Sequence, residues 1–296
     1  MRPDRTIPGR QRLDGGIGDT AAGAIGPEIH AEAVARAIRF MRQRLGEPQE
    51  LRDMAEVAFL SPFHFHRVFR ATTGAPPGRF LTALRMATAK SLLLETKLSA
   101  TTVSTAVGYS SFGTFTTQFT RLVGVAPGRF RAFTARVGDL CAGDLARLMP
   151  NDPDTGAQVR GWVGERPDQS KGVTLIGLFV SGIPQERPQS CTLTVSPGPV
   201  ALPCAHLSGD FAALAFSVRW DATVRETLIE DSAAGLYVGA HATGVRVSQG
   251  RASDGFSIPL RAMRITDPPV LSAYPLLLLA GRDELHDGGF GERLSG

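Results

Sequence analysis

The chain has 296 residues, of which 43% are hydrophobic and 20% charged, so it can bury a core and is long enough for two domains. Its three cysteines have no Cys-x-x-Cys spacing, which argues against a disulfide framework and a metal site and predicts free buried thiols. No apolar stretch reaches the length of a signal peptide core or a membrane span, so we expect a cytoplasmic protein without membrane contact.

The formal net charge of +4 hides an asymmetry along the chain. Residues 28 to 136 carry fifteen Lys and Arg against seven Asp and Glu, whereas residues 137 to 296 carry thirteen against eighteen. Between Thr96 and Gly138 there is no carboxylate at all. A surface this basic favours a polyanion such as nucleic acid as the partner.

The beginning of the chain divides into a tail and two helices. Residues 1 to 27 are rich in Gly, Arg and Asp and lack apolar periodicity, which predicts a disordered tail. From residue 28 to residue 45 apolar residues recur at steps of three and four, which predicts an amphipathic helix. A shorter helix is expected over Glu50 to Ala58, with Phe59 and Leu60 making the turn after it.

The next helix has clear start and stop signals. Ser61 can accept hydrogen bonds from the free amides of the first turn, and Pro62 suits the first helical position. The helix is expected to run to about Thr73 and to stop at Gly74, which can adopt the left-handed conformation. Its inward positions are Phe65, Val68 and Phe69. Its outward positions are Pro62, Phe63, His66, Arg67 and Arg70.

A long helix from about Gly78 to Leu94 is expected to join this unit to a second copy of itself. Sliding residues 57–80 onto residues 107–130 superposes the two segments without a gap, fifty residues apart. The paired positions are Val57 with Val107, Ser61 with Ser111, Phe65 with Phe115, Phe69 with Phe119, Gly74 with Gly124, and residues 77–80 with 127–130. A compact repeat of this kind indicates two helix-turn-helix units, which are common readers of DNA. In the second copy we expect a turn at Gly108 and Tyr109 and a reading helix from Ser111 to Val123.

Several residues of the second copy carry a family resemblance. Residues 108–111, the pair Phe115 and Phe119, residues 124–127 and residues 129–131 resemble the signature of the AraC/XylS family of transcription regulators, over about 110 residues. The resemblance implies two reading helices, each entering a major groove of double-stranded DNA and touching bases from its first two turns. The implied base-reading residues are Pro62, Phe63, His66 and Arg67 in the first helix and Phe112, Gly113, Thr116 and Thr117 in the second.

The chemistry of these positions favours the first reading helix. Arg67 can donate two parallel hydrogen bonds to guanine, and Phe63 can contact a thymine methyl group. Thr117 is short where the family often has a long polar residue, so weaker or shape-based reading is expected there. We expect phosphate contacts from Arg70, Arg79, Arg121, Arg129 and Arg131. Solvated surface charge is the alternative for Arg79, Arg129 and Arg131, but Arg79 and Arg129 occupy equivalent sites beside a helix start, which favours phosphate binding.

The second half of the chain has a different pattern. Residues 137 to 156 look like a linker that begins with a helical remnant and ends in turn formers. Short β-prone runs follow, separated by Gly and Pro, with one short helix at Asp221 to Glu230. The expected strands are Gln158–Val163, Val173–Val180, Cys191–Val195, Phe211–Val218, Leu236–Ala240, Thr243–Val247, Phe256–Ala262 and Val270–Leu279. This pattern predicts an antiparallel sandwich or small barrel over residues 157 to 285, followed by a tail over 286 to 296.

The predicted fold is therefore multidomain: an all-α tandem helix-turn-helix domain of about seven helices at residues 28 to 136, then an all-β sandwich domain. Residues 198–203 and 207–211 are similar to the strand-turn-strand of transthyretin-like and carboxypeptidase-regulatory-like sandwiches. The AraC/XylS resemblance implies that the companion domain senses a small molecule or forms a homodimer, and that RNA polymerase is a further partner. Most members of the family place that domain before the reader, whereas this chain places it after.

No motif for catalysis stands out. The chain lacks a Gly-x-Ser-x-Gly elbow, a phosphate-binding loop and a His-Glu-x-x-His helix. His206, Asp210 and Asp221 are candidates for a carboxylate–histidine pair, but nothing in the sequence places them together. We therefore expect a DNA-binding regulator that is not an enzyme and has no cofactor or metal. The alternatives are an architectural or scaffold protein on DNA without effector control and, further away, an enzyme tethered to DNA.

Overall fold

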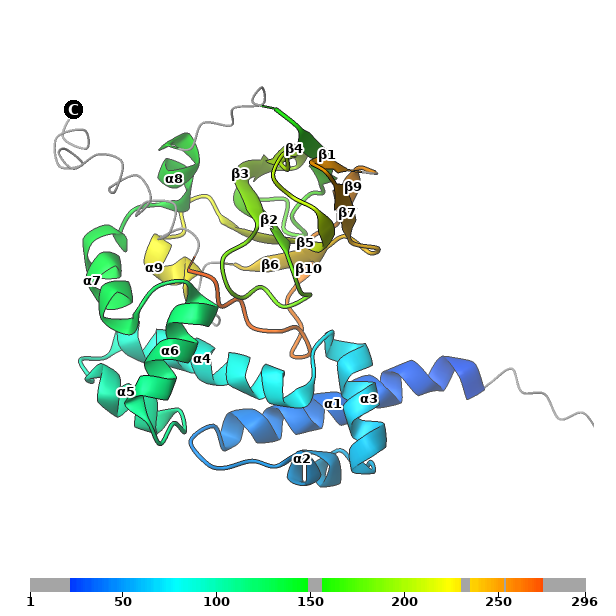
Figure 1. The fold of residues 1–296 in the computed structure, drawn as a ribbon, viewed down its shortest axis with the longest axis vertical. Coiled ribbons are helices and arrows are strands. Elements are labelled where there is room, and N and C mark those ends of the chain that lie inside the picture. Colours follow the sequence, from blue (N-terminus) through cyan, green and yellow to red (C-terminus); the bar gives the residue numbers. More distant parts are fainter. Residues whose placement is uncertain (1–21, 149–155, 230–234, 253, 274–296) are drawn as a thin grey trace, which may run out of the picture.

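The computed structural model describes residues 22–148, 156–229, 235–252 and 254–273. Most helices lie at one end of the molecule and the strands at the other, while the short helices at Ala142–Leu148 and Val224–Thr227 lie beside the strands (Figure 1). This arrangement confirms the predicted helical region followed by a region rich in strands. No helix within the described ranges is both long and apolar enough to cross a membrane.

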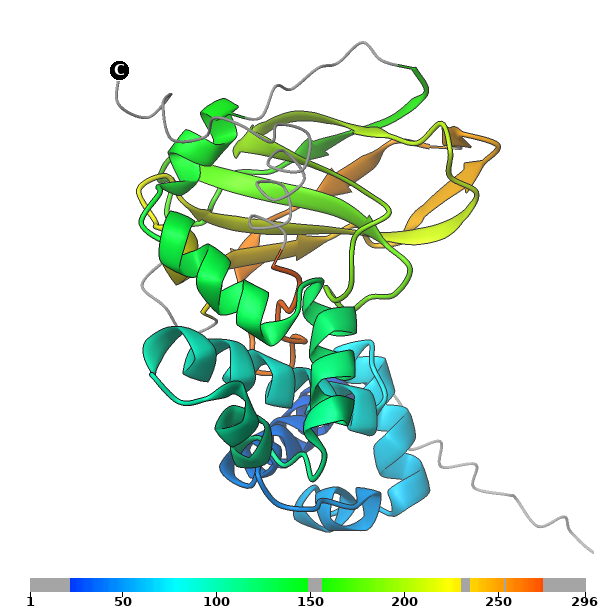
Figure 2. The same cartoon turned by 60° about the vertical axis from the view of Figure 1, so that its left-hand side comes forward.

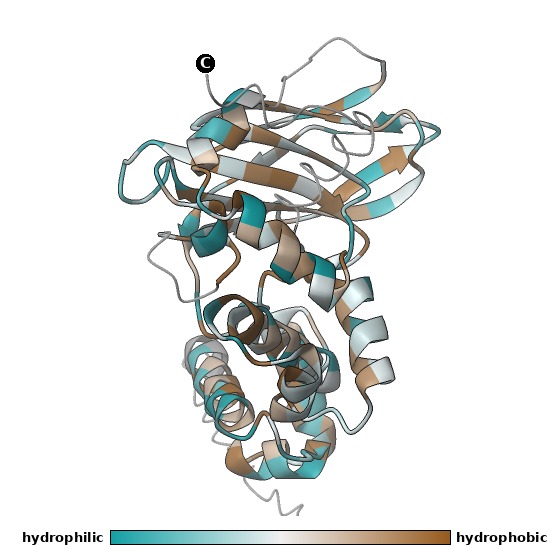
Figure 3. Ribbon diagram, turned by 90° about the vertical axis from the view of Figure 1, so that its left-hand side faces the viewer, coloured by the Kyte–Doolittle hydropathy of each residue, from teal (hydrophilic) through white to brown (hydrophobic). Residues whose placement is uncertain are grey.

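The helical region consists of two lobes joined by a long helix. The first lobe holds α1 (Ala22–Gln43), α2 (Leu51–Val57) and α3 (Pro62–Thr73), the joining helix is α4 (Pro77–Glu95), and the second lobe holds α5 (Ala100–Ala106), α6 (Phe112–Val123) and α7 (Pro127–Val137). These helices match the expected number. Helix α1 begins earlier than predicted, inside the stretch 1 to 27 that we expected to be a disordered tail; residues 1 to 21 lie outside the described residues. Apolar and polar segments alternate along the helices, as amphipathic helices require (Figure 3).

Each lobe has its own aromatic core. In the first, Phe65, Phe69 and Phe80 are fully buried, with successive ring centroids 5.3 Å apart. In the second, Phe115 and Phe119 are fully buried with centroids 5.6 Å apart. The predicted inward positions of the first reading helix, Phe65, Val68 and Phe69, are therefore confirmed, and the second reading helix buries Phe115 and Phe119 at equivalent places.

The structure corrects the register of the repeat. Helices α3 and α6 are fifty residues apart, but α2 and α5 are only forty-nine residues apart, because the second turn is one residue longer. The buried residues Met54, Ala55 and Ala58 correspond to Val103, Ser104 and Val107. The predicted pairing of Val57 with Val107 is therefore wrong, since Val107 occupies the place of Ala58.

The strands form two sheets that enclose a common apolar core. Their bounds are β1 Gln158–Val163, β2 Gly172–Phe179, β3 Ser190–Ser196, β4 Gly198–Pro203, β5 Gly209–Arg219, β6 Tyr237–Ala240, β7 Val245–Ser248, β8 Arg251–Ala252, β9 Phe256–Ile258 and β10 Arg261–Ala262. The small sheet has the order β4-β1-β9, and the large sheet has the order β10-β6-β5-β2-β3, with β7 and β8 extending from β5. Side chains of both sheets, among them Val159, Leu202, Ile176 and Ala213, meet in one cluster.

Four details of the sheets differ from the prediction. Strand β1 pairs with β9 in parallel, so the region is not purely antiparallel. The expected strand at residues 256 to 262 is divided into β9 and β10, which belong to different sheets. Residues 270 to 273 have no strand, and the rest of the expected strand to Leu279 lies outside the described residues. Strands β4 and β5, which carry the transthyretin-like resemblance, also lie in different sheets.

The large sheet is covered on both faces. Every residue of β2 is buried, which is typical of a strand packed on two sides. The inner face meets the small sheet, whereas the outer face carries Val173, Leu175, Phe216 and Val218. Helix α8 (Ala142–Leu148) packs on this outer face beside β2 and β3, and Figure 2 shows α7 and α8 running alongside the sheet.

The segment predicted as a linker is therefore built into the fold up to residue 148. The amides of Ala142 and Gly143 donate to the carbonyls of Ala222 and Trp220 at 2.8 and 2.9 Å. Helix α7 also packs on α9 (Val224–Thr227), the short helix expected near residues 221 to 230. Ala142 and Ala222 are buried in one cluster with Val173 and Val218 of the large sheet, so this part of the segment packs on the sheet. Residues 149 to 155 lie outside the described residues.

Candidate nucleic-acid interface

The two reading helices begin and end in the same way. Ser61 and Ser111 cap them, each hydroxyl accepting the backbone amide three residues on, at 3.4 Å. Gly74 and Gly124 end them with φ values of 74° and 95°, a region that side chains disfavour. These signals, all present in the sequence, fix where α3 and α6 start and stop.

On α3 the four predicted base-reading residues lie on the surface. Pro62, Phe63, His66 and Arg67 are all exposed, and the side chain of Phe63 is 83% exposed. An aromatic ring that open to solvent contributes little to the core, so its place on the first turn is unexplained by folding. The first turns of α3 therefore present an apolar group and a guanidinium group on one helix face.

On α6 the predicted residues differ in accessibility. Phe112 is 44% exposed, with its ring stacked on Phe115, and Gly113 and Thr117 are exposed. A Cβ added at Gly113 would touch only the Ser111 hydroxyl, at 3.8 Å, so open space surrounds this backbone. Thr116 is half-buried, and its Oγ1 is shielded from solvent without a hydrogen-bond partner among the described residues. Its hydroxyl is therefore poorly placed to reach a base.

The five arginines expected to bind phosphate have different surroundings. Arg70, Arg79 and Arg129 are exposed beside the reading helices or at the starts of α4 and α7. Arg121 pairs with Glu186 at 3.2 Å and donates to the Gln118 side chain at 2.8 Å.

Arg131 has a structural set of partners. Its guanidinium donates to the carbonyls of Leu93, Thr96 and Leu98, at 2.9, 3.4 and 2.6 Å, at the end of α4. Those carbonyls lack helical partners, so we expect Arg131 to fasten the loop after α4. In the first lobe Arg85 does the same for the loop after α1, donating to Leu45 and to Glu47.

The β-rich region contacts both lobes, which the sequence did not reveal. Ile183, in the loop between β2 and β3, is buried in the core of the first lobe. The amide of Glu186, in the same loop, donates to the carbonyl of Leu122 at 2.8 Å in the second lobe. Both residues lie in a loop without periodicity, so no pattern could have predicted this contact.

The C-terminal part of the described chain makes a second connection. Leu271 and Ala273 are buried in the core of the second lobe, and the Ala273 amide donates to the Val123 carbonyl, the last residue of α6, at 3.0 Å. The buried Lys90 of α4 donates to the Val270 carbonyl at 2.9 Å. Helix α6 is thus attached to the β-rich region at its C-terminal end.

Groups that suggested other chemistry are dispersed. The carboxylates of Asp210 and Asp221 pair with Arg246 and Arg219, respectively, and His206 is exposed. Among the described residues no cluster of three or more His, Cys, Asp or Glu could hold a metal ion. The cysteines are free thiols, as predicted; Cys204 is buried, while Cys141 and Cys191 are only half-buried.

The buried Arg166 of the β-rich region is neutralised within the fold. Its guanidinium pairs with Asp168 at 3.0 Å and donates to Ser217 and to the Gly235 carbonyl. Hydrogen bonding from Arg166 lowers the pKa of the Asp168 carboxyl to about 2. Arg166 is therefore part of the core of this region and is inaccessible to DNA.

Comparisons with known proteins agree with this geometry. A family model described as a helix-turn-helix domain matches residues 54–132. The uncharacterized HTH-type transcriptional regulator YobQ of Bacillus subtilis is 30% identical over 95 residues, 32% of this chain and 39% of the relative. The HTH-type transcriptional regulator Rv1931c of Mycobacterium tuberculosis is 32% identical over 90 residues, 30% of this chain and 35% of the relative.

Solved structures also match part of the chain. The DNA-binding domain of AdpA in complex with a target DNA is 29% identical with a TM-score of 0.34, over 35% of this chain and 94% of that chain. An AraC-type regulator from Chromobacterium violaceum is 26% identical with a TM-score of 0.35, over 40% of this chain and 99% of that chain.

Residues 54–132 therefore form a helix-turn-helix domain. The chain spans well under half the length of the curated relatives that it matches.

Proposed function

We propose that this chain is a sequence-specific, DNA-binding transcription regulator of the AraC/XylS type, acting in the cytoplasm. The observation that supports the proposal most is the pair of equivalently capped helices, α3 and α6, each with an exposed first turn, on a basic region of the chain. In this proposal both helices enter successive major grooves on one face of the duplex, about 34 Å apart, and α4 sets their separation.

The two reading helices are assigned unequal roles. Arg67 reads a guanine by two parallel hydrogen bonds, and Phe63 contacts a thymine methyl group beside it. The second helix offers Phe112, Gly113 and Thr117, which suit apolar contact and close approach. Arg70, Arg79 and Arg129 bind phosphates and set the register without reading sequence.

The β-rich region is assigned a regulatory role, either binding a small molecule or pairing with a second copy of the chain. Its contacts with both lobes support this assignment, because a change in it reaches the reading helices directly. RNA polymerase is the further partner that a transcription regulator of this kind requires. The architectural alternative predicts DNA binding that no small molecule alters.

The test is selection of bound duplexes from a random pool by the full chain, followed by affinity measurements on single-base variants of the selected site. Arg67→Ala should relax preference at one base pair, worth roughly 1–3 kcal/mol. Arg129→Ala should weaken all sequences alike and reduce the salt slope by about one.

Arg160→Ala is the matched control, since it removes an exposed arginine from β1 in the small sheet. Arg160→Ala should change neither the base-pair preference nor the salt slope of DNA binding. If the pool yields no preferred sequence, or if Arg67→Ala and Arg129→Ala lose affinity uniformly, the roles assigned here are wrong.

A further inference from the structure

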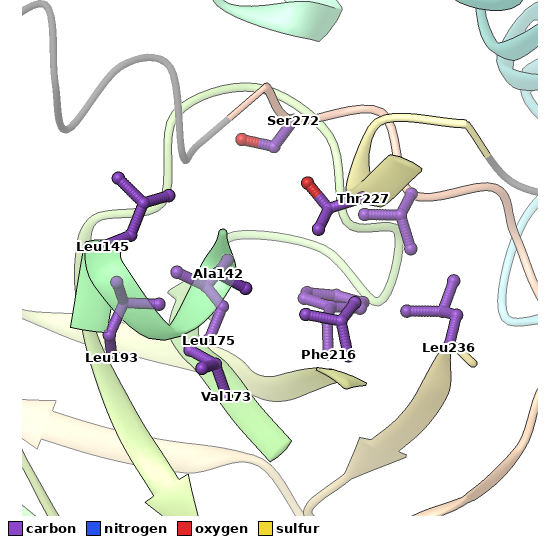
Figure 4. Close-up of a pocket in the computed structure, with 11 residues that line it drawn as sticks. Ala142, Leu145, Val173, Leu175, Leu193, Phe216, Thr227, Leu236 and Ser272 are labelled. Atoms are coloured by element: carbon purple, nitrogen blue, oxygen red, sulfur yellow. The ribbon is translucent and has the colours of Figure 1, made fainter. Parts of the chain in front are cut away.

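A pocket lies between the outer face of the large sheet and the elements that join it to the second lobe. Val173 and Phe216 of the sheet form its floor, Leu145 of α8 and Leu236 line its sides, and Thr227 and Ser272 line the rim (Figure 4). Its cavity volume is about 60 Å³. The pocket therefore lies where the sheet, α8, α9 and the C-terminal segment meet.

The lining of the pocket is apolar apart from two hydroxyl groups. None of the described residues that line it has a charged side chain. The Thr227 hydroxyl donates to the carbonyl of Val224 at 2.7 Å, so its proton is already used. Ser272 is 6% exposed, and its Oγ is shielded from solvent without a hydrogen-bond partner among the described residues. A buried hydroxyl left unpaired costs free energy that a ligand can recover.

The size of the cavity limits what it can hold. Pockets for drug-sized ligands measure roughly 300–1,000 Å³, and an engineered apolar cavity of about 150 Å³ holds benzene. A cavity of about 60 Å³ fits a molecule with only a few carbon atoms. A carboxylate or an ammonium group would lose its hydration in this pocket without a charged partner.

We propose that this pocket binds a small, uncharged organic molecule with an apolar body and a single carbonyl or hydroxyl group, which hydrogen-bonds to Ser272. The binding step depends only on the pocket. Its consequence for DNA depends on the function proposed above and deepens it, because it names the chemical class of the effector.

The pocket is physically connected to the second reading helix. Leu145 lines the pocket and also packs in the core of the second lobe, together with Phe115 and Phe119. Ser272 lies between Leu271 and Ala273, which are both buried in that same core, and Ala273 is hydrogen-bonded to the end of α6. A molecule that moves the Ser272 backbone or the Leu145 side chain therefore shifts α6 relative to α3.

Binding is tested first without DNA, on the full chain, by ligand-observed NMR titration with 2-butanone and with 2-butanol. We expect saturable binding with a dissociation constant on the order of millimolar, since ligands this small have few contacts. Butanoate, of similar size but charged, should bind at least about tenfold more weakly. Ser272→Ala should weaken binding of 2-butanone by roughly 3- to 10-fold, the value of one hydrogen bond.

Ser257→Ala is the matched control, because it removes an exposed serine hydroxyl from β9 in the small sheet. It should bind both probes like the wild type. The proposal is overturned if neither probe binds saturably, if butanoate binds equally well, or if Ser272→Ala and Ser257→Ala behave alike. Ser272→Ala removes an unpaired buried hydroxyl, so it should fold; its thermal unfolding checks this.

The consequence for DNA is tested by fluorescence anisotropy with a duplex selected from the random pool. Saturating 2-butanone should change the affinity for DNA by about fivefold or more, the lower end of typical allosteric couplings. In Ser272→Ala the same change should require a concentration of 2-butanone roughly 3- to 10-fold higher, in line with its weaker binding. If a probe binds but no duplex is selected, the pocket proposal holds and the proposed DNA-binding regulator is contradicted. If a duplex is selected but no probe binds, the proposed regulator holds and the pocket proposal is overturned. If both bind without affecting each other, the regulatory link between them is overturned.

Discussion

The two lobes of the reader share a sequence pattern but complete their cores in different ways. The first lobe receives Ile183 from the β-rich region, with Ile265 packed against it. The second lobe receives Leu145, Val224, Leu228, Leu271 and Ala273, so much of its core is made by residues outside the repeat. Duplication has thus produced two similar backbones with unequal dependence on the rest of the chain.

The same inequality holds for the surfaces of the reading helices. At equivalent positions α3 carries Arg67 and Arg70, whereas α6 carries Thr117 and Thr120. The single arginine of α6, Arg121, pairs with Glu186 of the β-rich region. We infer that the first lobe provides most of the base reading and that the second lobe provides the connection to regulation.

The largest expected effect on stability comes from removing one buried ring from the core of each lobe. Phe69→Ala and Phe119→Ala remove equivalent, fully buried rings and should each destabilise the chain by about 3–5 kcal/mol. In Phe119→Ala, amide exchange should also accelerate in α8, α9 and residues 271–273, because they share its core. In Phe69→Ala the acceleration should concentrate in α1 to α3. Equal patterns in both variants, measured by hydrogen exchange and urea unfolding, would show that the lobes do not differ in this way.

A smaller effect tests the corrected register of the repeat. Phe59 and Gly108 occupy the same place in the two turns, with φ values of 57° and 85°. A Cβ at Gly108 would lie 2.7 Å from the Leu45 carbonyl oxygen, so Gly108→Ala should destabilise the chain by about 1–3 kcal/mol. Phe59→Gly should stabilise it by up to about 1 kcal/mol, because it relieves the backbone strain of a left-handed residue. Thermal unfolding of both variants checks these opposite signs.

The next effect concerns the arginines that fasten loops in each lobe. Arg85→Ala and Arg131→Ala each leave two or more carbonyls without a charged donor and should cost about 1–2 kcal/mol of stability. Neither should reduce the salt slope of DNA binding, unlike Arg129→Ala. A lower slope for Arg131→Ala would restore it as a phosphate contact, as the sequence first suggested.

The smallest effect lies at the surface between α6 and the β-rich region. Arg121→Ala and Glu186→Gln break an ion pair whose side chains are about half exposed, so each should change stability by less than about 1 kcal/mol. The double variant should cost no more than the larger single one. A double-mutant cycle in urea measures this coupling, and Ala71→Arg gives the matching position on α3 a charge for comparison.

Local signals made most of the helical region predictable. Ser61, Gly74, Ser111 and Gly124 act on the backbone nearest to them, and the buried phenylalanines follow helical periodicity. The strands β1 and β2 were equally predictable from the sequence, because runs of apolar residues between turn formers define them.

Long-range contacts were not predictable from the sequence. The attachment of α8 to the sheet depends on Ala142 and Gly143 meeting residues near 220, and nothing near 142 indicates this partner. The role of Ser272 depends on what surrounds its hydroxyl, which only the fold determines. Arg131 was assigned to phosphate because sequence gives its charge, whereas its carbonyl partners come from a helix end thirty to forty residues away.

The composition of the second lobe also has a consequence for synthesis of the chain. Phe119 is made about 150 residues before Ala273, yet both belong to one core, and closing so long a loop carries an entropic cost before its contacts are gained. During translation the first lobe needs Ile183 to complete its buried cluster, whereas the second must wait until residues 271–273 have left the ribosome. A nascent polypeptide stalled before residue 270 would therefore carry one almost finished reader and one with an open apolar surface, which chaperones recognise.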